Sequence, residues 1–214
     1  MVDVKYCGLT REEDAAYAAQ VGASFAGVIF AGGPRELTPD RARLIHAAAG
    51  GTLQRVGVFG ADFRTRIAHI VSRVPLDIVQ LHADPTAADV REARKVFGGS
   101  VWAVVRVVGG ALSESAAALF GEADAVLLDA KVPGGLGGSG VTLPWAQIAH
   151  GLGPIRQGSR LVLAGGLRPE NVAEAVDALS PDIVDVSSGV ESAPGIKDHA
   201  RMLAFFRAAT GSMT

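Results

Sequence analysis

The stretch VDVKYCGLTREEDAAYAAQVGASFAGVIF, residues 2–30, decides the fold that we expect. It contains two short apolar runs, Val2–Cys7 and Phe25–Phe30, separated by an Ala-rich segment. Runs of this length fit buried strands, and the longer amphipathic segment between them fits a helix. Together they form one strand–helix–strand unit.

The same alternation continues through the chain. Six further runs are expected strands: Gln54–Phe59, Ile78–His82, Val101–Val107, Ala125–Asp129, Leu161–Ala164 and Ile183–Val186. Strict alternation without long linkers favours a parallel sheet, and eight such units close into a barrel. We therefore expect residues 1–214 to form a single-domain (β/α)8 TIM barrel of the α/β class. A flavodoxin-like or Rossmann sheet is the alternative, and the lack of Gly-x-Gly-x-x-Gly after the first run counts against dinucleotide binding.

Several helix starts can be predicted. Thr10 and Glu13 fit a capping box that opens the first helix. Pro39 and Pro169 each fit a first helical position. The segment Asp62–Arg73 is an expected helix that Pro75 prevents from extending further. Its expected buried residues are Ile67, Ile70 and Val71.

Composition excludes several classes of function. Hydrophobic residues make up 49% of the 214 residues and the net charge is −2, so nucleic acid and anionic membranes are poor candidate partners. No segment approaches about 18 uninterrupted apolar residues, and the N-terminal residues do not fit a signal peptide. The single cysteine, Cys7, excludes an internal disulfide, so we expect a cytoplasmic protein.

Polar residues on the strands are expected to face the barrel lumen. Side chains alternate along a strand, and the purely apolar parity should face the helices. The other parity places these polar residues inside the barrel or at its mouth: Lys5, Cys7, Gln80, His82, Asp129 and Asp185. Arg106 joins them if its parity follows Trp102 and Val104. Because the first and last strands become neighbours when the barrel closes, we expect an ion pair between Lys5 and Asp185.

Cys7 and Asp129 each end a strand, at the end of the barrel that carries active sites. A thiol has a reference pKa of about 8.5, so as a base near neutrality Cys7 would need nearby cations or N–H groups to lower it. An acid at Asp129 would have to keep its proton, which partial desolvation favours. The alternatives are a small buried hydrophobe at Cys7 and a loop-opening aspartate at Asp129. The glycine-rich segment 134–140 follows Asp129 and fits either a loop that closes over substrate or a solvated linker.

Two glycine-containing segments predict a phosphate site. One is 164–167, with Gly165 and Gly166, and the other is 187–191, with Ser188 and Gly189. They follow the seventh and eighth strands, where barrel enzymes usually bind phosphate, although turn chemistry alone would also use glycine.

Arginine and histidine give further expectations. Arg35, in a loop held by Gly and Pro, suits a carboxylate at the barrel mouth, although most arginines on a surface are only solvated. A histidine metal site is not expected, because nothing in the sequence brings together the histidines on expected helices: His46, His69, His150 and His199.

These residues resemble the phosphoribosylanthranilate isomerase family of tryptophan biosynthesis. The resemblance spans nearly the whole chain, and the motifs that carry it are KYCGLT (5–10), GPR (33–35), VQLH (79–82), LLD (127–129), GGSG (137–140), LAGGL (163–167), PENV (169–172), DVSSGVE (185–191) and PGIKD (194–198). Three departures are Gly33 in place of Ser, Ala83 in place of Gly, and Leu143-Pro144-Trp145 in place of Phe-Asp-Trp. They put the closure of the loop after the sixth strand, and hence substrate affinity, in question.

The resemblance implies an Amadori rearrangement of N-(5-phosphoribosyl)anthranilate, a phosphorylated small molecule. Asp129 would be the general acid, Cys7 the general base, and Arg35 the partner of the anthranilate carboxylate. The phosphate would be held by Gly165, Gly166, Ser188 and Gly189, and the site would be lined by His82 and Asp185. The resemblance implies no cofactor and no metal, and it is compatible with a monomer or a homodimer.

Two rival interpretations remain. The related sugar-phosphate isomerase of the histidine pathway performs the same rearrangement, but it has aspartate where this chain has Cys7. A catalytically inactive barrel that binds a phosphorylated ligand is the other, and the presence of both Cys7 and Asp129 argues against it.

Overall fold

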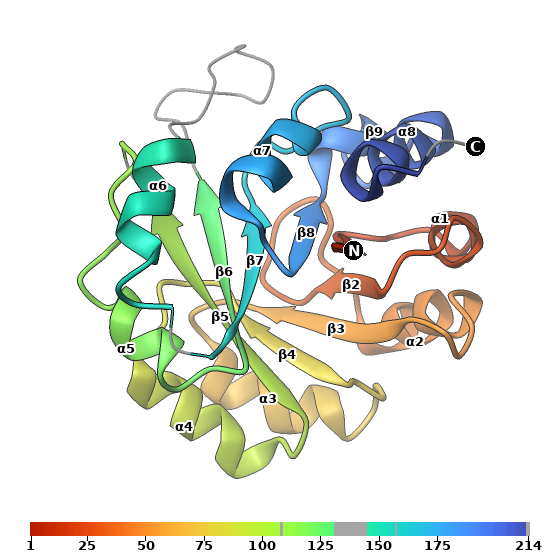
Figure 1. The fold of residues 1–214 in the computed structure, drawn as a ribbon. Coiled ribbons are helices and arrows are strands. Elements are labelled where there is room, and N and C mark those ends of the chain that lie inside the picture. Colours follow the sequence, from red (N-terminus) through yellow and green to blue (C-terminus); the bar gives the residue numbers. More distant parts are fainter. Residues whose placement is uncertain (108, 131–144, 157, 213–214) are drawn as a thin grey trace.

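Eight parallel strands close into a barrel in the computed structural model, which describes residues 1–107, 109–130, 145–156 and 158–212 (Figure 1). The strands follow one another around the barrel in chain order, and pairing of the first with the eighth closes it. They are β1 (Asp3–Tyr6), β2 (Phe25–Ile29), β3 (Gln54–Phe59), β4 (Ile78–Leu81), β5 (Ser100–Val107), β6 (Ala125–Ala130), β7 (Arg160–Ala164) and β8 (Ile183–Val186). The expected (β/α)8 barrel is confirmed.

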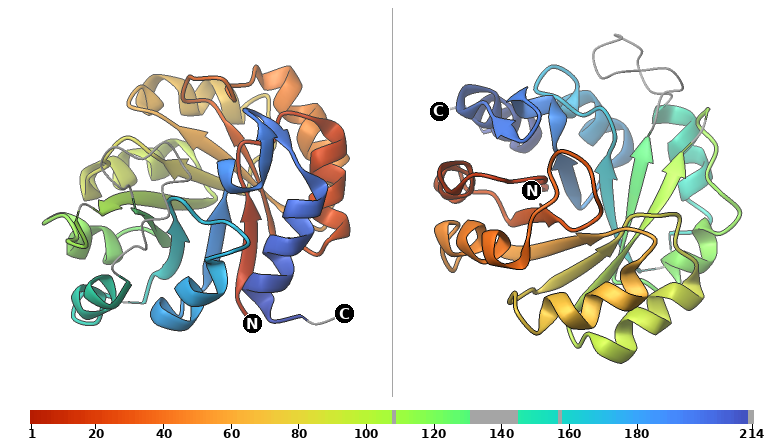
Figure 2. Two further views of the ribbon diagram at one scale, coloured as in Figure 1. Left: turned by 90° about the horizontal axis from the view of Figure 1, so that it is seen from above. Right: turned by 180° about the vertical axis from the view of Figure 1, so that it is seen from behind.

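Helices surround the strands on the outside of the barrel, as the views in Figure 2 show. They are α1 (Glu12–Gln20), α2 (Pro39–Ala48), α3 (Phe63–Val71), α4 (Ala87–Val96), α5 (Ala116–Phe120), α6 (Trp145–Leu152), α7 (Val172–Leu179) and α8 (His199–Thr210). Between β8 and α8 the chain forms a 3-10 turn, η1 (Ser188–Val190), and a short antiparallel hairpin of β9 (Glu191–Ala193) and β10 (Ile196–Lys197). This hairpin was not expected from the sequence.

The core has two apolar layers, which correspond to the two faces of the strands. The layer between strands and helices includes Val4, Tyr6, Val79, Leu81, Val184 and Val186. The layer inside the barrel includes Phe25, Val56, Ile78, Trp102, Leu127 and Ile183. The expected parity is therefore confirmed for β1, β4 and β8, because the purely apolar face of these strands packs on the helices.

The helix at Pro39 begins as expected, since Pro39 is its first residue and the Thr38 side chain accepts a hydrogen bond from the Arg41 amide. The expected capping box of Thr10 and Glu13 is wrong. Arg11 precedes the first residue of α1, and the Thr10 hydroxyl donates to the carbonyl of Gly195 in the β9–β10 turn. The hydroxyl that the local pattern assigned to the start of the helix is therefore used in a hydrogen bond to a residue far away in the sequence.

The expected helix start at Pro169 is also wrong. The Asn171 side chain accepts a hydrogen bond from the Arg168 amide, which holds residues 168–171 in a turn, and α7 begins at Val172. The helix α3 buries Ile67 and Ile70 as expected, whereas Val71 at its end is only partly buried.

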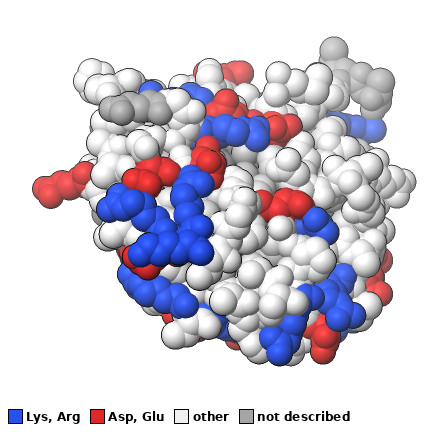
Figure 3. Space-filling model, turned by 90° about the horizontal axis from the view of Figure 1, so that it is seen from below, with Lys and Arg blue, Asp and Glu red and all other residues white. Residues whose placement is uncertain are grey.

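The surface mixes both signs of charge. On the face in Figure 3, acidic and basic side chains lie beside one another. Ion pairs recur over the molecule, as in the pair of Arg91 with Glu122 and the pair of Arg156 with Asp182. Among the described residues no helix has both the length and the apolar character needed to cross a membrane.

Candidate active site

A cavity of about 390 Å³ lies at the carboxyl ends of the strands. Eight of the nine expected site residues line it: Cys7, His82, Asp129, Gly165, Gly166, Asp185, Ser188 and Gly189. The apolar and amide side chains that complete its walls include Ile29, Val58, Gln80 and Leu127. The barrel thus brings together residues that lie in, or shortly after, β1, β4, β6, β7 and β8 and are far apart in the sequence.

Lys5 and Asp185 form a buried ion pair beside this cavity. They are paired across β1 and β8, and Lys5 Nζ lies 2.7 Å from Asp185 Oδ2, which confirms the expected contact. Burial lowers the pKa of Lys5, but the negative charges of Asp185 and Cys7 outweigh it and the pKa is raised from its ordinary value. The second carboxylate oxygen of Asp185 has no hydrogen-bond partner within the described residues. It can therefore accept a hydrogen bond from a bound molecule.

Cys7 lies directly after β1, and its amide donates to the Val186 carbonyl on β8. The side chain is buried, with 7% of the residue exposed. Burial raises the pKa of the thiol, and the ammonium groups of Lys5 and Lys197 oppose that effect only in part. The lowered pKa that a base would need is therefore not found in this structure, because desolvation of the thiolate outweighs the two cations.

His82 and Asp129 both line the cavity, and His82 Nε2 lies 4.0 Å from Asp129 Oδ2. Burial lowers the pKa of His82, and the charge of Asp129 opposes this. A neutral imidazole can donate one hydrogen bond and accept another. Arg106 follows the lumen parity of Trp102 but extends to the mouth, where it pairs with Asp84 at 2.9 Å.

The two glycine segments meet at one side of the cavity. Gly165 and Gly166 have φ values of 82° and 71°, in the left-handed region that favours glycine. A Cβ atom at Gly189 would overlap the carbonyl oxygen of Leu167, so the segments after β7 and β8 are in direct contact. The amides of Gly165, Gly166, Ser188 and Gly189 donate to no protein acceptor in the described part of the chain. Backbone amides gathered at one cavity in this way can bind an anion.

Arg35 is the one expected site residue that does not line the cavity. Its Nε and Nη2 donate to the two carboxylate oxygens of Glu191, at 2.8 and 2.6 Å. Glu191 in turn accepts from Lys197, whose Nζ also donates to the Cys7 carbonyl at 2.6 Å. Sequence reasoning gave neither Glu191 nor Lys197 a role. Both lie in motifs noted above, but their contacts depend on the β9–β10 hairpin.

The expected loop over the site, residues 134–140, lies outside the described residues. The described histidines of the expected helices lie on separate elements, α2, α3, α6 and α8. In the described ranges no three His, Cys, Asp or Glu residues are grouped so as to hold a metal ion.

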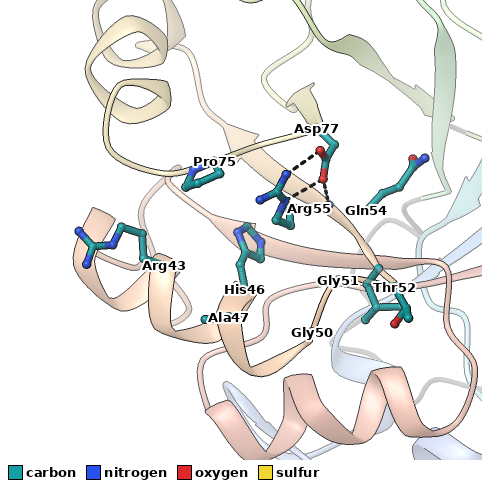
Figure 4. Close-up of a pocket in the computed structure, with 11 residues that line it drawn as sticks. Arg43, His46, Ala47, Gly50, Gly51, Thr52, Gln54, Arg55, Pro75 and Asp77 are labelled. Carbon is teal, nitrogen blue, oxygen red and sulfur yellow. Dashed lines mark hydrogen bonds and ion pairs between the residues drawn. The ribbon is translucent and has the colours of Figure 1, made fainter.

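A second hollow, of about 600 Å³, lies at the opposite end of the barrel (Figure 4). Its walls include Arg43, His46, Arg55 and Asp77. The Arg55 guanidinium is already neutralised by a two-bond pair with Asp77, both bonds 2.8 Å long. This hollow contains none of the expected site residues, and barrel enzymes carry their chemistry at the other end.

Comparison with known proteins assigns the family. Residues 4–208 match the family model described as N-(5'phosphoribosyl)anthranilate (PRA) isomerase. An N-(5'-phosphoribosyl)anthranilate isomerase from Pseudomonas fluorescens is 41% identical over 205 residues, which cover 95% of this chain and 96% of the relative. The phosphoribosyl anthranilate isomerase of Thermotoga maritima is 38% identical, with a TM-score of 0.88 over 99% of this chain and 100% of that one.

A further solved structure of such an isomerase contains reduced 1-(o-carboxyphenylamino)-1-deoxyribulose 5-phosphate. It is 35% identical, with a TM-score of 0.84 over 99% of this chain and 100% of that one. The closed barrel, the cavity at its carboxyl end and these matches together show that the chain belongs to the N-(5'-phosphoribosyl)anthranilate isomerase family, which are aldose–ketose isomerases of tryptophan biosynthesis.

Proposed function

We propose that the chain catalyses the Amadori rearrangement of N-(5-phosphoribosyl)anthranilate to 1-(2-carboxyphenylamino)-1-deoxyribulose 5-phosphate. The observation that carries the proposal is that Cys7 and Asp129, from β1 and β6, line one cavity together with the two glycine segments. The reaction needs an acid and a base on different sides of one sugar, and strands that are not neighbours can supply them.

Asp129 gives its proton to the furanose ring oxygen as the C1–O bond breaks, and the nitrogen lone pair forms the C1=N bond of a Schiff base. Cys7, as thiolate, removes the proton from C2 to give an enolamine. The enolamine becomes the ketone when C1 gains a proton and the C2 hydroxyl loses one, so no atom is added or lost overall. His82, 4.0 Å from Asp129, is suited to hold the carboxyl group in place.

Substrate binding divides between two sides of the mouth of the cavity. The free amides around Gly165, Gly166, Ser188 and Gly189 suit the phosphate. Arg35 is the proposed partner of the anthranilate carboxylate, at the side of the cavity formed by the loops after β1 and β8. The relative solved with a reduced form of the product carries a ligand with both of these groups.

The test is the loss of fluorescence of phosphoribosylanthranilate with the wild type, Cys7→Ala and Asp129→Ala. We expect turnover by the wild type and rates at least about a hundredfold lower in both variants, because each removes one proton-transfer group. Folding of each variant is checked by circular dichroism. A folded wild type without turnover would contradict the proposal and would favour the histidine-pathway substrate or an inactive binder.

We further propose that the chain acts as a monomer or a homodimer, with no nucleic-acid or membrane partner. Solved relatives include a dimeric isomerase from Thermotoga maritima and monomers generated from it. Size-exclusion chromatography with light scattering distinguishes the two states.

A further inference from the structure

A buried cluster of charged side chains lies beside the cavity without lining it. The Lys197 side chain is 0% exposed and that of Glu191 is 5% exposed. Lys197 Nζ donates to three oxygens: Cys7 O at 2.6 Å, Ser187 O at 3.0 Å and Glu191 Oε1 at 2.9 Å. Three acceptors match the three N–H groups of an ammonium. Lys197 therefore ties the residues that follow β1 and β8 to the carboxylate of Glu191.

Glu191, which Lys197 holds in place, also binds the side chain of Arg35. The guanidinium presents Nε and Nη2 to the two carboxylate oxygens, a geometry that fixes the plane and direction of the group. The stem of Arg35 lies over Gly8, where a Cβ atom would approach its Cδ to 2.7 Å. Gly8 directly follows Cys7. The Arg35 side chain is thus held by its ion pair with Glu191 at the guanidinium, and it packs on the backbone of Gly8, where a larger residue would not fit.

The pairing with Glu191 uses only one edge of the guanidinium. Of the five N–H groups of arginine, Nε–H and one Nη2–H donate to Glu191. Nη1 donates to no acceptor in the described part of the chain, so the edge formed by Nη1 and Nη2 is available. That edge matches a second carboxylate with two parallel hydrogen bonds.

Stability alone does not account for this cluster. A buried ion pair loses much of its attraction to desolvation, and apolar residues of similar volume are often as stable or more so. In this structure Glu191 accepts three hydrogen bonds from two cations. Burial by itself raises the pKa of Glu191, but the bonds from Arg35 and Lys197 outweigh it and the pKa lies below its usual value. The carboxylate is charged at neutral pH and available to orient the arginine.

We propose that Glu191, anchored by Lys197, is a positioning residue that orients Arg35 so that its free edge receives the carboxylate of the substrate's aromatic ring. This inference rests on the proposed function and adds to it the residue that sets recognition of the carboxylate. Glu191 does not line the cavity, so its effect on the substrate would pass through Arg35.

The test compares two substrates that differ only in the carboxylate, phosphoribosylanthranilate and N-(5-phosphoribosyl)aniline. Glu191→Gln keeps the size of the side chain but replaces one carboxylate oxygen, which accepts a hydrogen bond from Arg35 or Lys197, with an NH2 group that can only donate. We expect it to raise KM for the anthranilate substrate at least about tenfold, with kcat changed by less than about threefold, because binding shared by ground and transition states is lost. For the aniline substrate we expect KM to change by less than about twofold.

A matched control is Asp77→Asn, which breaks the two-bond pair with Arg55 at the opposite end of the barrel. It should leave both KM values unchanged. If Glu191→Gln does not fold, Glu191→Asp keeps the charge opposite Lys197 but shortens the reach to Arg35. It should show the same selective loss, to a smaller degree.

Three outcomes are informative. Selective loss on the anthranilate substrate supports the positioning role. An equal increase in KM for both substrates, or no increase for either, would overturn the positioning role. Turnover of phosphoribosylanthranilate by the wild type would still support the proposed function in that case. A folded wild type that turns over neither substrate would overturn the proposed function and the positioning role with it.

Discussion

Cys7 shows how far a residue's neighbours decide its chemistry. The thiol lies between two cations, Lys5 and Lys197, yet burial outweighs both and raises its pKa. Part of the reason is that each ammonium group already forms an ion pair with a carboxylate. Lys5 is paired with Asp185, and Lys197 with Glu191. The cations are therefore shared, and the thiolate gains only part of their attraction.

The pH dependence of catalysis should report this raised pKa. Only the thiolate can remove the C2 proton, so kcat/KM should increase with pH on a limb that lies above the ordinary thiol pKa of about 8.5. The measurement is kcat/KM for phosphoribosylanthranilate across neutral and alkaline pH.

The matched variant is Cys7→Asp. A carboxyl group ionises at far lower pH than a thiol, so any remaining activity should lose the alkaline limb. A limb near neutrality in the wild type would show that the cations outweigh burial in the working enzyme.

Among the elements, the segments after β7 and β8 depend most on contact with each other. Neither segment alone distinguishes a turn from a phosphate site. Their meeting favours the proposed phosphate site, because Gly189 lies against the Leu167 carbonyl and all four residues, Gly165, Gly166, Ser188 and Gly189, line one cavity.

Gly189→Ala should therefore force the two segments apart. Overpacking of this kind costs about 1–3 kcal/mol in the free energy of unfolding. We expect binding of the reduced product analogue, measured by calorimetry, to weaken at least about tenfold, which corresponds to about 1.4 kcal/mol.

Gly98→Ala is the control, because a Cβ atom at Gly98, in the loop between α4 and β5, meets nothing within 4 Å. It should leave both stability and binding within error of the wild type. Unchanged binding in Gly189→Ala would mean that the phosphate site does not need this contact.

At the scale of the whole molecule, the barrel is closed by contacts between the first and last segments of the chain. β1 pairs with β8, the Tyr6 hydroxyl donates to the Met202 carbonyl in α8 at 2.7 Å, and the Lys197 amide donates to Asp14 in α1 at 3.1 Å. The first and last segments of the chain are thus held together at several points, and the last two contacts join residues 196 and 183 positions apart.

One buried histidine should make the stability of this closed molecule depend on pH. His46 on α2 is 4% exposed, and burial lowers its pKa from 6.5 to about 4. The unfolded chain therefore binds this proton more tightly than the folded one. Stability from this residue is fully present above pH 6.5 and is lost as the pH falls toward 4, by about 3 kcal/mol in all.

His46→Leu should remove this part of the pH dependence, measured as the free energy of unfolding in urea at pH 7 and pH 4.5. The exposed His69 on α3 provides the control, as His69→Gln. The same loss of stability toward acid pH in His46→Leu and the wild type would contradict the assignment.

Much of the fold follows from local sequence patterns. The eight apolar runs predicted the eight strands to within one residue at every end, because periodicity depends on neighbours in the chain. The parity of Lys5 and Asp185 predicted their ion pair, since closure of the barrel makes β8 the second neighbour of β1, beside β2. Helix starts were less reliable. The pattern around Thr10 predicted a capping box that does not form, because the Thr10 hydroxyl donates to the distant carbonyl of Gly195 instead.

The sequence by itself determined the barrel, the side of each strand that faces the lumen, and the set of residues at its carboxyl end. These depend on the alternation of side chains along a strand and on the order of the strands. Only the tertiary structure decided what those residues face. Arg35 and Glu191 are 156 positions apart and meet where Lys197 holds the β9–β10 hairpin to the carbonyl of Cys7, directly after β1. The raised pKa of Cys7 is likewise a balance of burial against shared charges, and that balance exists only once the ends of the barrel have closed.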